Sequence, residues 1–273
     1  MQTAFDVSRR EHHFINRYDH SPRFFGMAAA EIRDLSGMAD FRAAEALQPA
    51  VWGKGDVPDP AELMMVIQAE GGLAAGAFVD DRLVGYIFAS PSATSGVQHS
   101  QRLAVLPDMR GRGLGVALKW YQRSWCLTHG VRHVRWTFDP MRAINAALNI
   151  DRLGARSTTY LVDYYGAMGG INEGLPSDRL LVDWFLDDPV VDAKSEGRLP
   201  RENVEDCLRV RLPHDLETLL RQDRNKALAA RLMLRDSLRD AFASGYGISG
   251  FDCSDGAYIL TPIFAAAKPK EKK

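Results

Sequence analysis

The stretch that most constrains this chain is a glycine- and arginine-rich run, residues 110–115, with the sequence RGRGLG. An apolar segment, 103–106, precedes it, and the pattern of an amphipathic helix starts near Leu114. This succession of a strand, a glycine-rich turn and the start of a helix predicts an anion site. The free N–H groups at a helix start carry partial positive charge, and glycine leaves room for the ligand. Arg110 and Arg112 add formal positive charge there.

Two well-known phosphate loops do not fit this run. A Walker loop would end in Gly-Lys-Ser/Thr, whereas Val116 and Ala117 follow Gly115 here. A dinucleotide fingerprint would place glycine at position 116 and an acidic residue about 20 residues further on, where Arg135 and its neighbours offer none. The pattern that remains is Gln/Arg-x-x-Gly-x-Gly/Ala.

Composition limits the partners of this site. The 273 residues are 46% hydrophobic and carry a formal net charge of −1. This balance gives no sequence-wide attraction to nucleic acid or to an anionic membrane, so we expect a small-molecule ligand. The three cysteines, Cys126, Cys207 and Cys253, lack metal-type spacing, and their odd number argues against a disulfide framework. We therefore expect a cytoplasmic protein without a metal; a homodimer is compatible with the sequence.

Hydrophobic periodicity divides the chain into five parts. We expect an N-terminal extension at 1–27, a main domain at 28–187, a polar linker at 188–203, a C-terminal α/β unit at 204–265 and a basic tail at 266–273. In the helix that starts near Leu114, an apolar stripe leaves Lys119 and Gln122 on the opposite face. Strands are expected at 31–35, 73–79, 83–90, 98–106, 131–138, 155–165 and 179–185, and helices at 38–50, 60–70, from 114, and at 143–153.

The loop pattern and this βααβββαβαββ order resemble the GNAT superfamily of acyl-CoA-dependent N-acyltransferases. The resemblance implies an α/β (α+β) fold with a mixed central sheet whose central strands splay, here with a smaller C-terminal α/β unit. It also implies that acyl-CoA is the co-substrate and that the loop grips its pyrophosphate. Carried over to this sequence, the coenzyme A ligands are Leu103, Ala104, Val105, Arg110, Gly111, Arg112, Gly113, Leu114, Gly115 and Asn145.

The same resemblance suggests catalytic residues. Several members carry a glutamate general base eleven residues before the first Gln/Arg of the loop, and this position holds His99. Histidine is mostly neutral at pH 7 and can accept a proton; the alternative is a structural histidine at the end of a strand. The tyrosine that many members use as general acid is replaced by Ile150. Tyr165 is our candidate substitute, with Tyr160 and Tyr164 as alternatives or core residues.

A narrower resemblance is to bacterial predicted acyltransferases linked to amino-acid N-succinylation. It rests on the motifs WTFDP at 136–140, LGA at 153–155, YYG at 164–166 and GLPSDR at 174–179. It implies succinyl-CoA or acetyl-CoA as donor and a small-molecule amine, such as an amino acid, as acceptor. Arg179, Ser177 and Asn172 are then candidate acceptor ligands, with Arg179 able to clamp a carboxylate or, alternatively, to pair with Asp178 or a nearby acid. A non-catalytic acyl-CoA-binding regulatory module is the other function that the sequence leaves open.

Overall fold

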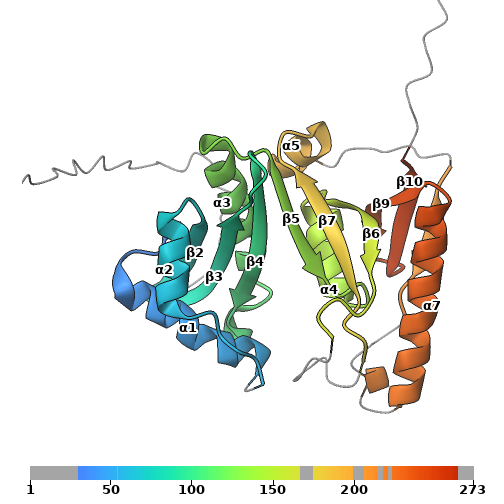
Figure 1. Cartoon of the computed structure of the whole chain (residues 1–273), viewed down its shortest axis with the longest axis horizontal. Helices are drawn as coiled ribbons and strands as arrows, with labels where there is room; N and C mark the ends of the chain where they lie inside the picture. The colour runs from blue at the N-terminus through green and yellow to red at the C-terminus, as the bar shows by residue number, and fades with distance from the viewer. Residues whose placement is uncertain are drawn as a thin grey trace, which may run out of the picture.

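The computed structural model describes residues 30–53, 55–166, 175–198, 206–213, 218–220 and 223–263. The expected N-terminal extension, Asn172 and the basic tail lie outside these residues. The strands of the described part form a single mixed sheet in the order β1-β2-β3-β4-β5-β7-β6-β9-β10-β8. Figure 1 shows the sheet running across the molecule, with its two ends formed by the two ends of the chain.

The first half of the sheet follows the predicted order closely. It contains β1 (Glu31–Asp34), α1 (Gly37–Trp52), α2 (Ala61–Ala69), β2 (Leu73–Val79), β3 (Arg82–Pro91) and β4 (Val97–Val105). Strands β2 and β3 form a hairpin, and Asp80 and Asp81 take positive φ angles of 49° and 60° in its turn. Such angles match the twist of a tight two-residue hairpin.

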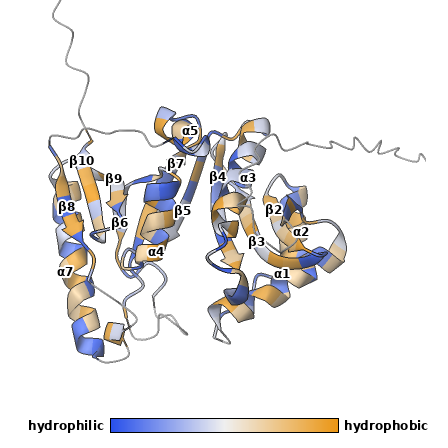
Figure 2. Ribbon diagram, turned by 180° about the vertical axis from the view of Figure 1, so that it is seen from behind, coloured by the Kyte–Doolittle hydropathy of each residue, from blue (hydrophilic) through white to orange (hydrophobic). Residues whose placement is uncertain are grey.

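Helices cover both faces of this half. Helices α1 and α2 close one apolar cluster around Phe41, Met64 and Phe88. The second cluster contains Leu73 and Ile87 and lies under α3 (Leu114–Thr128), which follows a short 3₁₀ turn, η1 (Pro107–Met109). Figure 2 shows hydrophobic residues along the strands and hydrophilic ones on the outer helix surfaces, as an interior between two helical layers requires.

The second half contains β5 (His133–Phe138), α4 (Ala143–Ala146), β6 (Arg156–Leu161) and β7 (Arg179–Phe185). The predicted helix at 143–153 continues from α4 as a π-helical segment, η2 (Ala147–Arg152). The predicted strand at 155–165 stops at Leu161, and Tyr164 and Tyr165 lie in a turn. The polar linker expected at 188–203 begins instead with α5 (Pro189–Ser195), because Asp188 caps its start and Val191 and Ala193 are buried.

The C-terminal unit continues the sheet. It consists of β8 (Leu208–Arg211), α7 (Arg224–Ala243), β9 (Tyr246–Asp252) and β10 (Ala257–Pro262), and β9 joins β6 through the pair Ser157 and Ile248. One apolar cluster runs from Val134 on β5 to Leu238 on α7 and Leu260 on β10. The unit therefore shares its core with the main domain. No helix in the described residues is long and apolar enough to cross a membrane.

Candidate active site

Strands β4 and β5 separate in the middle of the sheet. They are parallel neighbours only at Val97–His133, Gln98–Val134 and His99–Arg135, and no register pair follows His99. On its other edge β4 stays paired with β3 as far as Val105. The edge of β4 that faces β5 is therefore open from residue 100 onward, and Figure 1 shows the strands parting toward their carboxyl ends. This is the splay that the sequence predicted.

The glycine-rich loop lies at the open end of β4. Gly111 and Gly113 have φ angles of 75° and 76°, which side chains disfavour, and Gly113 is the N-cap residue of α3. No side chain caps this helix, and the first intrahelical hydrogen bond runs from the Ala117 N–H to the Gly113 carbonyl. The N–H groups before Ala117 therefore have no intrahelical partner. The geometry is that of an anion site.

His99 stands where the two strands part. Burial lowers the pKa of its imidazole below the usual value, and the positive charges of Arg135 and Lys119 lower it further. The imidazole is therefore neutral at pH 7 and able to accept a proton. Arg135, its register partner on β5, forms an ion pair with Asp183.

Tyr165 lies on the same side of β5 as Arg135. Its hydroxyl is 3.0 Å from the Thr137 hydroxyl, and Thr137 is two residues after Arg135, so the two share one face of the strand. The Tyr165 side chain is half exposed, at 52%. The structure therefore puts this tyrosine on the His99 face of the sheet, toward the open end of the splay.

Ser177 holds this turn in place. Its hydroxyl accepts a hydrogen bond from the Tyr165 N–H at 2.8 Å and donates to Asp163 at 3.2 Å, and its own N–H donates to Asp163. The side chain is buried. These contacts give Ser177 a local role in shaping the tyrosine turn.

Arg179, the first residue of β7, lies beside the same turn. Its guanidinium carbon is 5.3 Å from the centre of the Tyr165 ring, and its side chain is 9% exposed. Burial lowers the pKa of Arg179; Asp139 acts against this, while Arg231 and Arg142 act with it. Asp178, the neighbouring carboxylate, accepts hydrogen bonds from Arg235 on both of its oxygens.

The helix after β5 carries the remaining predicted ligand. Asn145 is half-buried in α4, and Asn149 on the following turn is buried. Ile150, at the position where the resemblance implied a tyrosine general acid in many members, is also buried in the core. Trp136 and Phe138 of β5 pack in the same core.

Sequence reasoning missed a buried lysine at the splay. Lys119 was predicted on the polar face of α3, yet its side chain is only 2% exposed. Its ammonium donates to the Gln122 amide oxygen at 2.8 Å and to the Ser100 hydroxyl at 3.3 Å, and it lies 3.7 Å from the Trp136 ring centre. Burial lowers the pKa of Lys119 to about 7. Gln122 is likewise buried, so the prediction for both side chains was wrong.

Comparison with known proteins identifies the segment that holds this site. Residues 30–148 match the acetyltransferase (GNAT) family, a stretch that contains β4, the glycine-rich loop, α3 and β5. No curated protein matches the sequence. No group of three or more His, Cys, Asp or Glu side chains in the described ranges could hold a metal ion.

Several solved structures resemble the chain at low sequence identity. The ribosomal-protein-S18-alanine N-acetyltransferase from Escherichia coli is 18% identical, covers 65% of this chain and 99% of its own, and has a TM-score of 0.48. A phosphinothricin acetyltransferase from Sinorhizobium meliloti, solved in complex with AcCoA, is 20% identical, covers 64% and 95%, and also has a TM-score of 0.48. Residues 30–148 thus match the acetyltransferase (GNAT) family, and the described chain has the mixed α/β sheet with flanking helices that this match implies.

Proposed function

We propose that this protein transfers an acetyl or succinyl group from coenzyme A to the amine of a small molecule such as an amino acid. The observation that carries the proposal is the parting of β4 from β5 at His99, together with the uncapped start of α3 after the open end of β4. Along the chain, a neutral base is thus followed by an open strand edge and then by an anion site. Acyl transfer from a thioester to an amine needs these three parts.

Coenzyme A would bind along this path. Its pyrophosphate would accept hydrogen bonds from the free N–H groups at the start of α3, with Arg110 and Arg112 adding charge. The pantetheine arm would lie along the open edge of β4 at Leu103, Ala104 and Val105, with Asn145 on its other side. A backbone N–H of this edge would stabilise the oxyanion that develops at the thioester carbonyl.

His99 would take the proton that the amine sheds as it attacks the thioester carbonyl. The C–N bond forms, the tetrahedral oxyanion collapses, and the C–S bond breaks to release coenzyme A as a thiolate. A thiol has a pKa of about 8.5, so this group leaves readily and is protonated by water or by the Tyr165 hydroxyl. Arg179 would bind a carboxylate of the acceptor or of the acyl group.

Release of coenzyme A thiol from purified protein tests the proposal. Acetyl-CoA and succinyl-CoA would each be supplied with L- and D-amino acids and with simple amines. The mass of the product would be measured by mass spectrometry. We expect acceptor-dependent release, and a decrease of roughly 10²- to 10⁴-fold in turnover for His99→Ala with acyl-CoA affinity kept. Burial lowers the pKa of His99 below that of an ordinary histidine, so wild-type activity should fall only when the pH drops below the ordinary histidine range, and the variant should lack this step.

His133→Ala is the matched control. His133 lies two residues before Arg135 on β5 and bonds Asp183 at 2.8 Å, so its loss should affect stability and leave turnover unchanged. Equal turnover in wild type and His99→Ala would remove His99 from the mechanism. Absence of thiol release with every donor and acceptor would contradict the proposed acyltransferase activity.

A non-catalytic acyl-CoA-binding module is the second candidate. It is favoured by Ile150, because the tyrosine that protonates the leaving thiolate in many relatives is replaced by a buried aliphatic side chain. Tight acyl-CoA binding without acceptor-dependent thiol release would support this candidate.

A further inference from the structure

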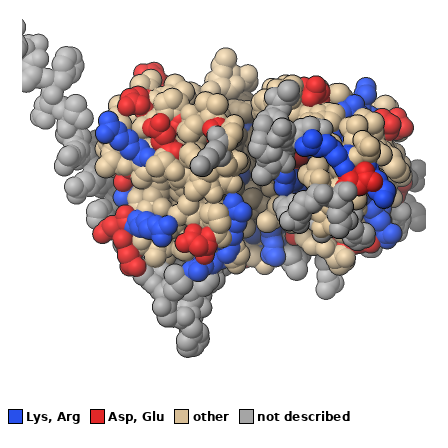
Figure 3. All heavy atoms as spheres, turned by 90° about the horizontal axis from the view of Figure 1, so that it is seen from below, with Lys and Arg blue, Asp and Glu red and all other residues tan. Residues whose placement is uncertain are grey.

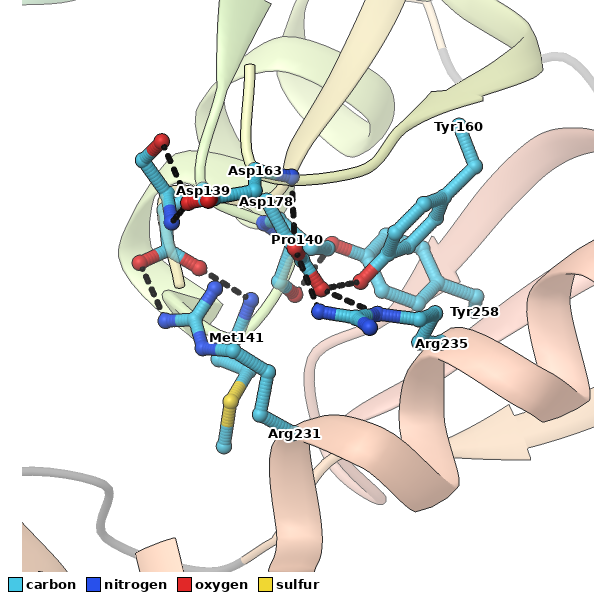
Figure 4. Close-up of polar contacts among 10 residues, drawn as sticks. Asp139, Pro140, Met141, Tyr160, Asp163, Asp178, Arg231, Arg235 and Tyr258 are labelled. Atoms are coloured by element: carbon cyan, nitrogen blue, oxygen red, sulfur yellow. Dashed lines mark hydrogen bonds and ion pairs between the residues drawn. The ribbon is translucent and has the colours of Figure 1, made fainter. Parts of the chain in front are cut away.

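Helix α7 of the C-terminal unit sends two arginines, Arg231 and Arg235, into the second half of the main domain. They are four residues apart and lie on one face of the helix. Figure 4 shows Arg231 directed toward Asp139 and Arg235 directed toward Asp178. The two side chains differ in how fully their N–H groups are used.

Arg235 is in a complete network. Its Nε and Nη2 donate to the two oxygens of Asp178 at 2.9 and 2.8 Å, and the Tyr160 hydroxyl and the Asp163 N–H also donate to this carboxylate. Burial raises the pKa of Asp178, but these hydrogen bonds, led by that from Arg235, outweigh burial and lower it. This pair is therefore structural.

Arg231 is buried more deeply but is only partly used. Its side chain is 2% exposed, and Nη2 donates to Asp139 at 2.8 Å. Its Nε and Nη1 are buried and have no hydrogen-bond partner among the described residues. The other oxygen of Asp139 accepts from the Met141 N–H at 3.0 Å, so the carboxylate itself is well bonded. The groups without a hydrogen-bond partner are therefore the N–H groups of the arginine.

Position connects this arginine to the proposed active site. Asp139 directly follows β5, so Arg231 lies at the carboxyl end of the strand that borders the splay. The Tyr258 hydroxyl donates to the Pro140 carbonyl at 2.7 Å and fixes this corner from β10. Arg179 is near enough for the charges of Asp139 and Arg231 to affect its pKa. Seen from below, Lys and Arg side chains gather on both sides of the recess between the halves of the molecule (Figure 3).

Unsatisfied N–H donors on a buried cation are unfavourable, and native proteins rarely leave them without a ligand. A carboxylate satisfies such a group best, because it supplies negative charge and acceptor oxygens together. Asp139 already orients the guanidinium, as a supporting residue would in a binding site.

We propose that Arg231, together with Arg179, binds a carboxylate group of the substrate, so that the C-terminal unit completes the substrate pocket. This inference rests on the proposed function and narrows it to a reaction in which the amine acceptor or the acyl donor carries a carboxylate. Arg179 lies beside the Tyr165 ring, and Arg231 lies buried beside Asp139.

Binding of succinate to the full chain tests the site without turnover. Succinamide is the neutral control ligand, and the shift in melting temperature at millimolar ligand is the measurement. We expect succinate, and not succinamide, to raise the melting temperature of the wild type. Arg231→Lys keeps the charge beside Asp139, and we expect it to weaken succinate binding about 10- to 100-fold, the worth of a charged hydrogen bond.

Arg235→Lys is the matched control, one helical turn away. It removes a guanidinium of the structural network and should leave succinate binding unchanged. Equal binding by wild type and Arg231→Lys, or equal effects of succinate and succinamide on the wild type, would overturn the inference. Arg231→Met would extend the series if it folds, and Arg231→Lys decides if it does not.

Kinetics then identify which substrate carries the carboxylate. Acetyl-CoA and succinyl-CoA would each be paired with an amino acid and with the amine that lacks its carboxylate. A fall of about 10- to 100-fold in kcat/KM for Arg231→Lys should appear only where the recognised carboxylate is present, on the acceptor or on the donor.

The two proposals can fail separately in these experiments. Turnover by the wild type that is unchanged in Arg231→Lys for every pair would overturn the carboxylate site and leave the proposed function standing. Succinate binding that depends on Arg231, without turnover of any pair, would overturn the proposed function and retain the site.

Discussion

The two halves of the sheet have different interiors. Before β4, Gln48 is the only buried amide or charged side chain of the described chain, and the two core clusters are apolar apart from the Tyr86 hydroxyl. From β4 onward, buried polar and charged residues recur: Gln98, Ser100, Lys119, Gln122, Asp139, Asn149, Ser157, Ser177, Asp178, Arg179 and Arg231. The first half is a packed scaffold, whereas the splay and the second half hold groups that are costly to bury.

This difference indicates where the chain uses its interior for more than packing. A buried polar group destabilises a fold unless it is hydrogen-bonded, so it persists where it connects elements or binds a ligand. Asp178 connects elements of the fold, because its carboxylate accepts hydrogen bonds from Arg235, Tyr160 and the Asp163 backbone. Arg231 has buried N–H groups without a hydrogen-bond partner, and for this reason we assign a ligand to it.

The largest expected effect separates the anion loop from ordinary turn glycines. Gly113→Glu places a side chain and a negative charge where the pyrophosphate would bind, so we expect coenzyme A binding to be abolished in calorimetry. Gly130→Glu is the control at the other end of the same helix, with a similar φ of 74° and open space around its Cβ position. Both variants should pay a similar strain of about 1 kcal/mol. Normal binding by Gly113→Glu would show that the loop is not the anion site.

A smaller effect tests whether an ion pair stabilises the packing of the C-terminal unit on the main domain. Arg235→Met leaves the fully buried Asp178 without its cation, and we expect a loss of about 3 kcal/mol in the free energy of unfolding. Two other donors remain, which places the loss at the low end for a broken buried pair. Denaturant unfolding would measure it.

The control for this experiment is Arg209→Met, which breaks exposed ion pairs with Asp252 and Asp255 in the same unit. Exposed pairs contribute little, so its unfolding midpoint should stay nearly unchanged. Equal losses for the two variants would contradict the distinction between a connecting ion pair and a surface one.

The smallest effect concerns the pH dependence that Lys119 gives to the splay. Its pKa is lowered to about 7 in the folded protein and is near 10.4 in an unfolded chain. Between these values the unfolded state holds one more proton, so stability rises with pH in this window and is reduced below it. We expect wild type to gain roughly 2 kcal/mol more than Lys119→Met between pH 7 and 9.

Lys226→Met serves as the control for an exposed lysine, since Lys226 lies on the surface of α7 beside Asp223. Its pH dependence should match the wild type. If Lys119→Met also keeps the wild-type slope, Lys119 is not titrating in this range and the indole rings of Trp136 and Trp184 hold it charged.

Local patterns predicted the first half of the fold within one or two residues. Alternating and continuous apolar runs located β2, β3 and β4, because strand periodicity is a local property of the sequence. The loop was predicted for the same reason: positive φ angles at Gly111 and Gly113 are local backbone properties. Helix α5 was missed, since its polar sequence hides the fact that Val191 packs into a core cluster built from distant parts of the chain.

The sequence by itself determined the strand order up to the loop, the loop and the position of His99 before it. Tertiary structure decided which polar side chains are buried. Lys119 reads as a surface residue of an amphipathic helix, yet Trp136 and Trp184 cover it; Arg231 reads as a surface charge, yet Asp139, 92 residues earlier, holds it inside. Burial depends on what packs against a face, and that partner comes from another part of the chain.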